Sequence, residues 1–229
     1  MSDKISIAID GPAGAGKSTI AKRVAGELGY TYIDTGAIYR TMALYFIDRG
    51  MDVSDEKLVS SLCAHIKVGI RYVDGAQHVF LEDRDVTDFI RTSEVGAGAS
   101  KISAYPAVRA SLLDLQRNMA ENDNVVMDGR DIGSVVLPNA EVKIYLTASV
   151  DERARRRYAE YVLAGQECDM DNIKKEIEER DHRDMTRDIS PLVCAPGATV
   201  IDSSHMTIDE VCAAVFKLVD KAKAGKESV

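Results

Sequence analysis

The chain has 229 residues, of which 45% are hydrophobic and 29% are charged, and its formal net charge is −8. This length suits one domain with an insert or two small domains, and the acidic balance argues against a general nucleic-acid-binding protein. No uncharged run reaches the roughly 18 residues of a membrane-spanning helix, and the N-terminus lacks a signal-peptide core. The four cysteines form no C-x-x-C pair, which is typical of reduced structural thiols. We therefore expect a cytoplasmic protein without polynucleotide or membrane partners.

Short apolar runs alternate along the chain with stretches in which apolar residues recur at helical spacing. In chain order, the expected elements are a strand at 5–9, a helix at 17–28, a strand at 30–33, a helix at 36–47, a helix at 105–120, a strand at 125–127, a strand at 142–146, helices at 150–163 and 173–188, a strand at 199–201 and a helix at 208–222. Strands separated by helices predict an α/β fold in which a parallel five-stranded sheet is covered by helices.

One segment departs from this alternation. Apolar and polar residues alternate over 66–73, Asp74-Gly75 follows, and a second apolar run begins at His78. An Asp-Gly pair between two such runs is a strong signal for a β-hairpin. An antiparallel hairpin within a series of parallel strands predicts a small inserted β subdomain, which we place at residues 52–93.

A glycine-rich loop joins the first expected strand to the first expected helix. Its sequence, from Gly11 to Ser18, matches the phosphate-binding pattern G-x-x-x-x-G-K-[ST]. In this pattern, backbone N–H groups surround the phosphates, the lysine reaches the β- and γ-phosphates, and the Ser18 hydroxyl ligates Mg²⁺. The positive end of the helix also points toward the anion. The loop therefore predicts a site for a nucleoside triphosphate with Mg²⁺.

Charged residues gather where the second and third expected strands end. Asp34-Thr-Gly-Ala-Ile-Tyr-Arg40 follows the second strand, and Asp128-Gly-Arg-Asp-Ile-Gly133 follows the third. Open α/β sheets bind ligands at the carboxyl ends of their strands. The two runs are therefore candidates for a second, phosphate-bearing substrate, although a purely structural network of salt bridges remains an alternative.

Together with the phosphate-binding loop, these runs resemble the bacterial cytidylate kinase family. So does the later segment Glu179-Arg-Asp-His-Arg-Asp184, which is followed by Arg187 and Ser190-Pro-Leu192. The resemblance covers essentially the whole chain. It implies a single P-loop kinase domain over 1–229 with a fold of the P-loop NTPase type, in which 52–93 is the subdomain that binds the nucleoside monophosphate and 165–187 is a helical lid. It also implies a monomer that transfers the γ-phosphoryl group of ATP to CMP or dCMP.

The resemblance also implies roles for individual residues. The catalytic residues would be Lys17, Arg130 and Arg187. ATP would be bound by Gly11, Pro12, Ala13, Gly14, Ala15, Gly16, Lys17, Ser18 and Thr19. CMP would be bound by Thr35, Arg40, Ser100, Arg109, Arg130, Asp131, Arg180 and Asp184. The magnesium ion would be held by Ser18 and, through water, by Asp128, with Asp34 as a further candidate. The family often has serine where Thr35 stands, and either residue supplies a hydroxyl.

The residues that the resemblance assigns to base recognition match the hydrogen-bonding groups of cytosine. A carboxylate at Asp131 would accept from the N4 amino group of cytosine, and Arg109 would donate to N3 and O2. Uracil would instead turn an oxygen toward Asp131, which is repulsive and leaves a buried group unpaired.

Several alternatives stay open at this stage. Another small P-loop kinase could take UMP or a hydroxyl acceptor such as shikimate, and a regulatory protein could bind nucleotide without catalysis. Arg153, Arg156 and Arg157 could close over the ATP phosphates or form a solvated helix face.

Overall fold

The computed structural model describes residues 4–227. The chain divides into two compact units. The first unit includes the chain up to Tyr32 and from Asp123 onward, and the second unit runs from Ile33 to Asn122. In the described part of the chain, no helix has the length and hydropathy of a membrane span.

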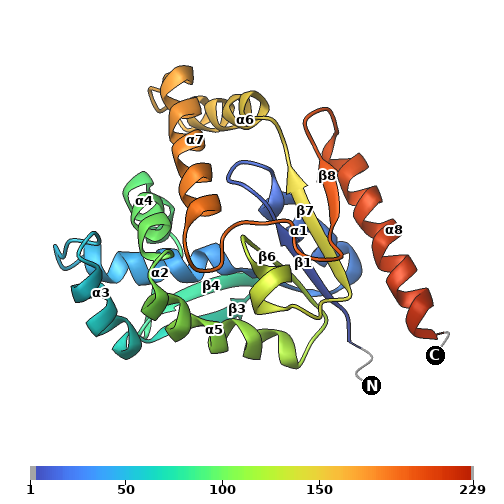
Figure 1. Ribbon diagram of the computed structural model, residues 1–229, viewed down its shortest axis with the longest axis horizontal. Helices are drawn as coiled ribbons and strands as arrows, with labels where there is room; N and C mark the ends of the chain where they lie inside the picture. Colours follow the sequence, from blue (N-terminus) through green and yellow to red (C-terminus); the bar gives the residue numbers. More distant parts are fainter. Residues whose placement is uncertain (1–3, 228–229) are drawn as a thin grey trace. The chain divides into compact units, whose positions relative to one another are not determined.

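The described strands of the larger sheet are β1 (Ser6–Asp10), β2 (Thr31–Asp34), β6 (Val125–Gly129), β7 (Val142–Thr147) and β8 (Thr199–Asp202). Their order is β2-β6-β1-β7-β8, and β1 pairs in parallel with both β6 and β7 (Figure 1). The predicted five-stranded sheet is confirmed. β6 is buried over its whole length, as expected for a strand with neighbours on both sides and cover on both faces.

The register of the central strands places Asp10 and Asp128 near the carboxyl ends of two adjacent strands, one residue out of step with each other. Ile9 is opposite Asp128, and Asp10 is opposite Gly129. Parallel strands have their carboxyl ends at the same edge, so the loop after β1 and the turn after β6 begin next to each other. That turn is a π-helical segment, η3 (Ile132–Val136).

The helices of the first unit are α1 (Lys17–Leu28), α6 (Val150–Leu163), α7 (Met170–Thr186) and α8 (Ile208–Glu227). α1 ends at Gly29, whose φ of 67° lies in the left-handed region that favours glycine. α1 and α8 share a core with the strands, to which Ile20, Val24, Val215 and Ile144 contribute. Each predicted helix of this unit is present, with ends within a few residues of those expected.

The second unit contains α2 (Thr35–Ile47), α3 (Glu56–Leu62), α4 (Ser93–Ile102) and α5 (Pro106–Glu121), with short 3₁₀ turns η1 (Cys63–His65) and η2 (Phe89–Arg91). Its three-stranded sheet consists of β3 (Val68–Val73), β4 (Ala76–Leu81) and β5 (Arg84–Asp85). β3 and β4 are antiparallel, and Asp74-Gly75 forms their turn. The predicted hairpin is therefore present.

Two helices of the second unit were not expected from the sequence. α4 contains Gly96 and Gly98, which lower helix propensity by about 1 kcal/mol each. A Cβ atom on Gly98 would lie 3.2 Å from Ile47 Cδ1 and 3.5 Å from Ala43 Cβ. Gly98 therefore allows α4 to pack closely on α2, and this packing supports a helix that local propensity does not. α3, the other helix, has only seven residues.

The predicted segments 52–93 and 165–187 can now be placed. Segment 52–93 lies within the second unit. Segment 165–187 includes the loop before α7 together with that helix. Their roles as a monophosphate-binding subdomain and a lid stay predictions.

Candidate active site

The phosphate-binding loop depends on glycine at several positions. Gly11, Gly14 and Gly16 have φ values of 149°, 77° and 89°, which residues with a Cβ rarely adopt. A Cβ on Gly11 would also lie only 1.9 Å from the carbonyl oxygen of Leu146 in β7. The loop then passes directly into α1 at Lys17, and the N–H groups of a first helical turn lack acceptors within the helix, which makes a helix start of this kind suited to bind an anion.

Lys17 is held inside this loop. Its side chain is buried, and Nζ donates to the carbonyl oxygen of Pro12 at 2.8 Å. Burial and the neighbouring Arg130 lower the pKa of Lys17 well below its usual value, while the carboxylates of Asp128 and Asp10 act in the opposite direction. A phosphate group beside Nζ would add to the effect of the two carboxylates and favour the charged ammonium.

Asp128 is the next-to-last residue of β6 and is 4% exposed. Ser18 Oγ donates to its Oδ2 at 2.9 Å, and Tyr32 Oη donates to its Oδ1 at 2.9 Å. A hydroxyl and a carboxylate next to the phosphate-binding loop form the hard oxygen donor set that Mg²⁺ prefers alongside phosphate oxygens. The residues therefore fit the implied magnesium ion. The contact with Tyr32 was not predicted, because it depends on β2 lying next to β6.

Arg130 and Asp131 lie between β6 and η3, and Asp10 fixes the start of η3. The Asp10 carboxylate accepts from the backbone N–H groups of Ile132 at 2.8 Å and Gly133 at 2.7 Å. Burial raises the pKa of Asp10 to about 6, against the effect of these two donors. Asp10 was not among the predicted site residues, since neither its spacing nor its residue type indicated that it would cap a turn far along the chain.

Residues of α7 pair with this turn. Arg130 Nε donates to Asp184 Oδ2 at 2.8 Å, and Arg187 Nη2 lies 3.7 Å from Asp131 Oδ1. Burial alone would raise the pKa of Asp184, but Arg130 and Arg180 bring it below its ordinary value of 3.8. Within the first unit, the structure thus brings together the residues predicted after β6 and those predicted on α7.

Two arginines near the start of α6 contact distant parts of the first unit. Arg153 is 4% exposed, donates to the Ala13 carbonyl oxygen at 3.1 Å, and pairs with Asp181 of α7 at 2.6 Å. Arg156 donates to the Ser203 carbonyl oxygen at 2.7 Å. Neither residue belongs to a solvated helix face. Sequence spacing alone could not show whether these arginines lie on a solvated helix face, because the carbonyl groups that they contact lie in loops far away along the chain.

The predicted site residues of the second unit form two groups. At the start of α2, Asp34 accepts from the N–H of Ala37 at 3.0 Å and pairs with Arg40 Nη2 at 2.8 Å. Thr35, the first residue of this helix, is buried. Both carboxylate oxygens of Asp34 therefore contact groups of α2, and its role as a magnesium ligand stays a prediction.

The second group lies where α4 meets α5. Arg109 Nη1 donates to the Ser103 carbonyl oxygen at 3.2 Å, and Ser103 Oγ donates to the Ser100 carbonyl oxygen at 2.9 Å. The guanidinium carbon of Arg109 also lies 5.7 Å from the centre of the Tyr39 ring. Ser100 Oγ is buried without a hydrogen-bond partner among the described residues, which is unusual for a buried hydroxyl and is expected of a group that binds a ligand.

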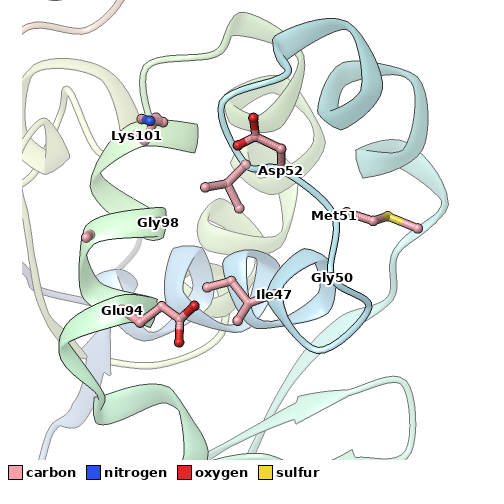
Figure 2. A pocket seen from close by; sticks show the side chains of 9 residues that line it. Ile47, Gly50, Met51, Asp52, Glu94, Gly98 and Lys101 are labelled. Atoms are coloured by element: carbon pink, nitrogen blue, oxygen red, sulfur yellow. The ribbon is translucent and has the colours of Figure 1, made fainter.

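A separate pocket of the second unit lies at the C-terminal end of α2, beside α4 (Figure 2). Its lining residues are Ile47, Gly50, Met51, Asp52, Val53, Glu94, Ala97, Gly98 and Lys101. None of these is a predicted site residue.

Comparison with known proteins identifies the family. A model of the family described as cytidylate kinase matches residues 7–221. The cytidylate kinase of Pediococcus pentosaceus is 49% identical over 226 residues, which cover 99% of this chain and 100% of the relative. The cytidylate kinase of Lactiplantibacillus plantarum is 47% identical over 220 residues, which cover 96% of each chain. A gluconokinase structure from Sinorhizobium meliloti shares the fold, with a TM-score of 0.50 at 14% identity, covering 100% of this chain and 99% of that one. The chain therefore belongs to the cytidylate kinase family.

Proposed function

We propose that this protein transfers the γ-phosphoryl group of ATP to CMP, and to dCMP as a second acceptor, which yields ADP with CDP or dCDP. The observation that carries this proposal is the assembly around the buried Lys17, in which Asp128 lies near the end of β6 and Arg130 and Asp131 follow that strand. Family membership over nearly the whole chain supports the same activity.

The acceptor needs no general base, because a nucleotide phosphate, with a second pKa of about 6, is already largely ionised at neutral pH. Catalysis is then a matter of positioning and charge neutralisation. Lys17, Arg130 and Arg187 supply positive charge around the transferred group. When bound at Ser18 and Asp128, Mg²⁺ supplies further neutralisation of the β- and γ-phosphates. The glycine-rich loop orients the donor through its backbone N–H groups.

Recognition of CMP is assigned to residues of both units. Thr35, Arg40 and Arg130 bind the acceptor phosphate, and Arg180 and Asp184 contact the ribose. Asp131, Arg109 and Ser100 read cytosine, with the carboxylate accepting from N4 and the guanidinium donating to N3 and O2. The buried Ser100 hydroxyl, which lacks a partner among the described residues, supports this assignment.

The activity test is ADP release from ATP and Mg²⁺ with CMP, dCMP, UMP, AMP and shikimate offered singly. We expect rapid release with CMP and dCMP and slow release with the others. Release with shikimate alone would favour a hydroxyl acceptor, and release with none would contradict a kinase. Asp131→Ala should reduce the preference for CMP over UMP by at least about tenfold, and an unchanged preference would remove Asp131 from base recognition.

We further propose that segment 165–187 is a lid, that 52–93 closes over the monophosphate, and that the protein acts as a monomer. Closure excludes water, which would otherwise hydrolyse ATP. Limited proteolysis with and without a bisubstrate analogue tests both motions, since bound analogue should protect both segments. Equal cleavage in the two samples would contradict closure. Sedimentation at several protein concentrations tests the monomer.

A further inference from the structure

Each carboxylate oxygen of Asp128 accepts a hydrogen bond from the side chain of a different element. Ser18 comes from the first turn of α1, which follows β1, and donates to Oδ2 at 2.9 Å. Tyr32 comes from β2 and donates to Oδ1 at 2.9 Å. β6 lies between β2 and β1 in the sheet, so one donor comes from the neighbouring strand β2 and the other from the helix that follows the neighbouring strand β1. All three residues belong to the first unit.

The phenol of Tyr32 is itself well anchored. Its ring is partly buried against the core that α1 and α8 share with the sheet, and the ammonium of Lys22 lies 5.7 Å from the ring centre. The position of the Tyr32 hydroxyl is therefore set by β2 and by the core against which the ring packs. The hydroxyl therefore donates to the Asp128 carboxylate from a defined position.

A fixed donor on one oxygen controls the orientation of the other. The torsion that rotates an aspartate carboxylate is broad and roughly two-fold, so a hydrogen bond on the second oxygen limits how far the group turns while Ser18 contacts it. A hydrogen bond to an ionised acceptor is about twice as strong as a neutral one. We infer that Tyr32 is a positioning residue, which holds Oδ1 so that Oδ2 stays directed toward Ser18 and the pair is preorganised for Mg²⁺ bound with ATP.

This inference rests on the proposed assignment of Ser18 and Asp128 to magnesium. Tyr32 acts through Asp128 and is not itself a catalytic residue. Partners of metal-binding groups commonly contribute about tenfold or more to metal affinity. The effect should therefore be seen in the magnesium requirement, and it should leave the affinity for CMP unchanged.

The first test is Tyr32→Phe, which removes one hydroxyl and keeps the ring in the core. We expect the Mg²⁺ concentration for half-maximal activity, at fixed ATP, to rise about tenfold, with the KM for CMP unchanged. A second readout needs no turnover: the rise in Tm produced by ATP with Mg²⁺, relative to ATP with EDTA, should be smaller in the variant. Tyr30→Phe is the matched control, since its ring lies near Lys223, and it should leave both quantities unchanged.

A double variant separates positioning from a general structural effect. In an Asp128→Ala background, Tyr32→Phe should cause no further change in the Tm increment from Mg²⁺, because the carboxylate it orients is absent. An equal loss in both backgrounds, or an unchanged magnesium requirement in Tyr32→Phe, would overturn the inference. If the wild-type protein failed to phosphorylate CMP while Tyr32→Phe still reduced the Tm increment, the proposed acceptor would be wrong and the inference about Tyr32 would stand.

Discussion

The predicted site residues of the two units differ in how they are paired. In the first unit, three arginines are matched with carboxylates, in the pairs Arg130–Asp184, Arg187–Asp131 and Arg153–Asp181. In the second unit, Arg109 is held by the Ser103 carbonyl oxygen, and the Ser100 hydroxyl is buried without a partner among the described residues. Paired charge thus predominates among these residues of the first unit. The second unit has one such pair, Arg40–Asp34, and in addition a buried hydroxyl with hydrogen-bonding capacity for a ligand.

This difference suggests that substitutions at the paired charges of the first unit affect the rate and stability in addition to CMP recognition, whereas substitution of Ser100 in the second unit mainly affects how well CMP binds. Preorganised charge acts where charge develops during the reaction. An unsatisfied hydroxyl gains its partner when the ligand binds. Substitutions in the two units should therefore affect different measured quantities.

The largest effect is expected for Lys17→Met. Nζ is buried in the phosphate-binding loop, and removing one preorganised charged donor lowers kcat by about 10²- to 10³-fold. Steady-state kinetics with saturating ATP and CMP measure this loss. Lys217→Met, at an exposed position of α8, is the control and should keep full activity. A loss of less than tenfold for Lys17→Met would show that the lysine is not central to phosphoryl transfer.

Asp184→Ala should have a large effect on stability, in addition to the loss of the proposed contact with the ribose. It leaves the Arg130 guanidinium without its ion-pair partner, which costs about 3 kcal/mol in the free energy of unfolding. The folded state lowers the pKa of Asp184, so the contribution of this pair is present at neutral pH and is lost as pH falls below about 4. Urea unfolding at pH 7 measures the change. Asp151→Ala, which breaks the exposed pair with Lys174, should cost less than about 1 kcal/mol, and equal losses would contradict the comparison.

Asp10 should have the opposite pH dependence. Its pKa is raised from 3.8 to about 6 in the folded state, so the folded protein binds more protons than the unfolded chain between these values, and stability falls as pH rises through this range. Asp10→Asn removes this dependence. The stability of the variant relative to wild type should therefore increase by about 1 kcal/mol between pH 5 and pH 7. A constant difference in unfolding free energy across these pH values would exclude the raised pKa.

The smallest change in stability is expected for Ser100→Ala. Removing a buried hydroxyl that lacks a partner should change the unfolding free energy by less than about 1 kcal/mol, or slightly stabilise the protein. The KM for CMP should rise several-fold with little change in kcat. Ser111→Ala, which loses the bond from Oγ to the Val108 carbonyl oxygen, is the control and should leave the KM for CMP unchanged. An equal KM in all three proteins would mean that Ser100 does not bind CMP.

The sequence predicted the parts of the molecule that depend on local patterns. The phosphate-binding loop, the strands and the Asp74-Gly75 hairpin follow from spacing and turn chemistry, and the structure contains all of them. α4 was missed because its helix depends on packing against α2 at Gly98. Tyr32 and Asp10 were missed because their partners lie 96 and more than 120 residues away along the chain, and strand order cannot be obtained from one sequence.

The pairing of Ile9 with Asp128 has a consequence for how the protein reaches its active form. Successive side chains of a strand point to opposite faces, so a shift of β6 by one residue relative to β1 would turn Asp128 away from Ser18 and bring Met127 or Gly129 into its place. A chain folded with that error could keep much of its secondary structure and still lack the Ser18–Asp128 pair. Recovery of activity during refolding would then report the alignment of these two strands, whereas recovery of the far-ultraviolet circular dichroism signal would not.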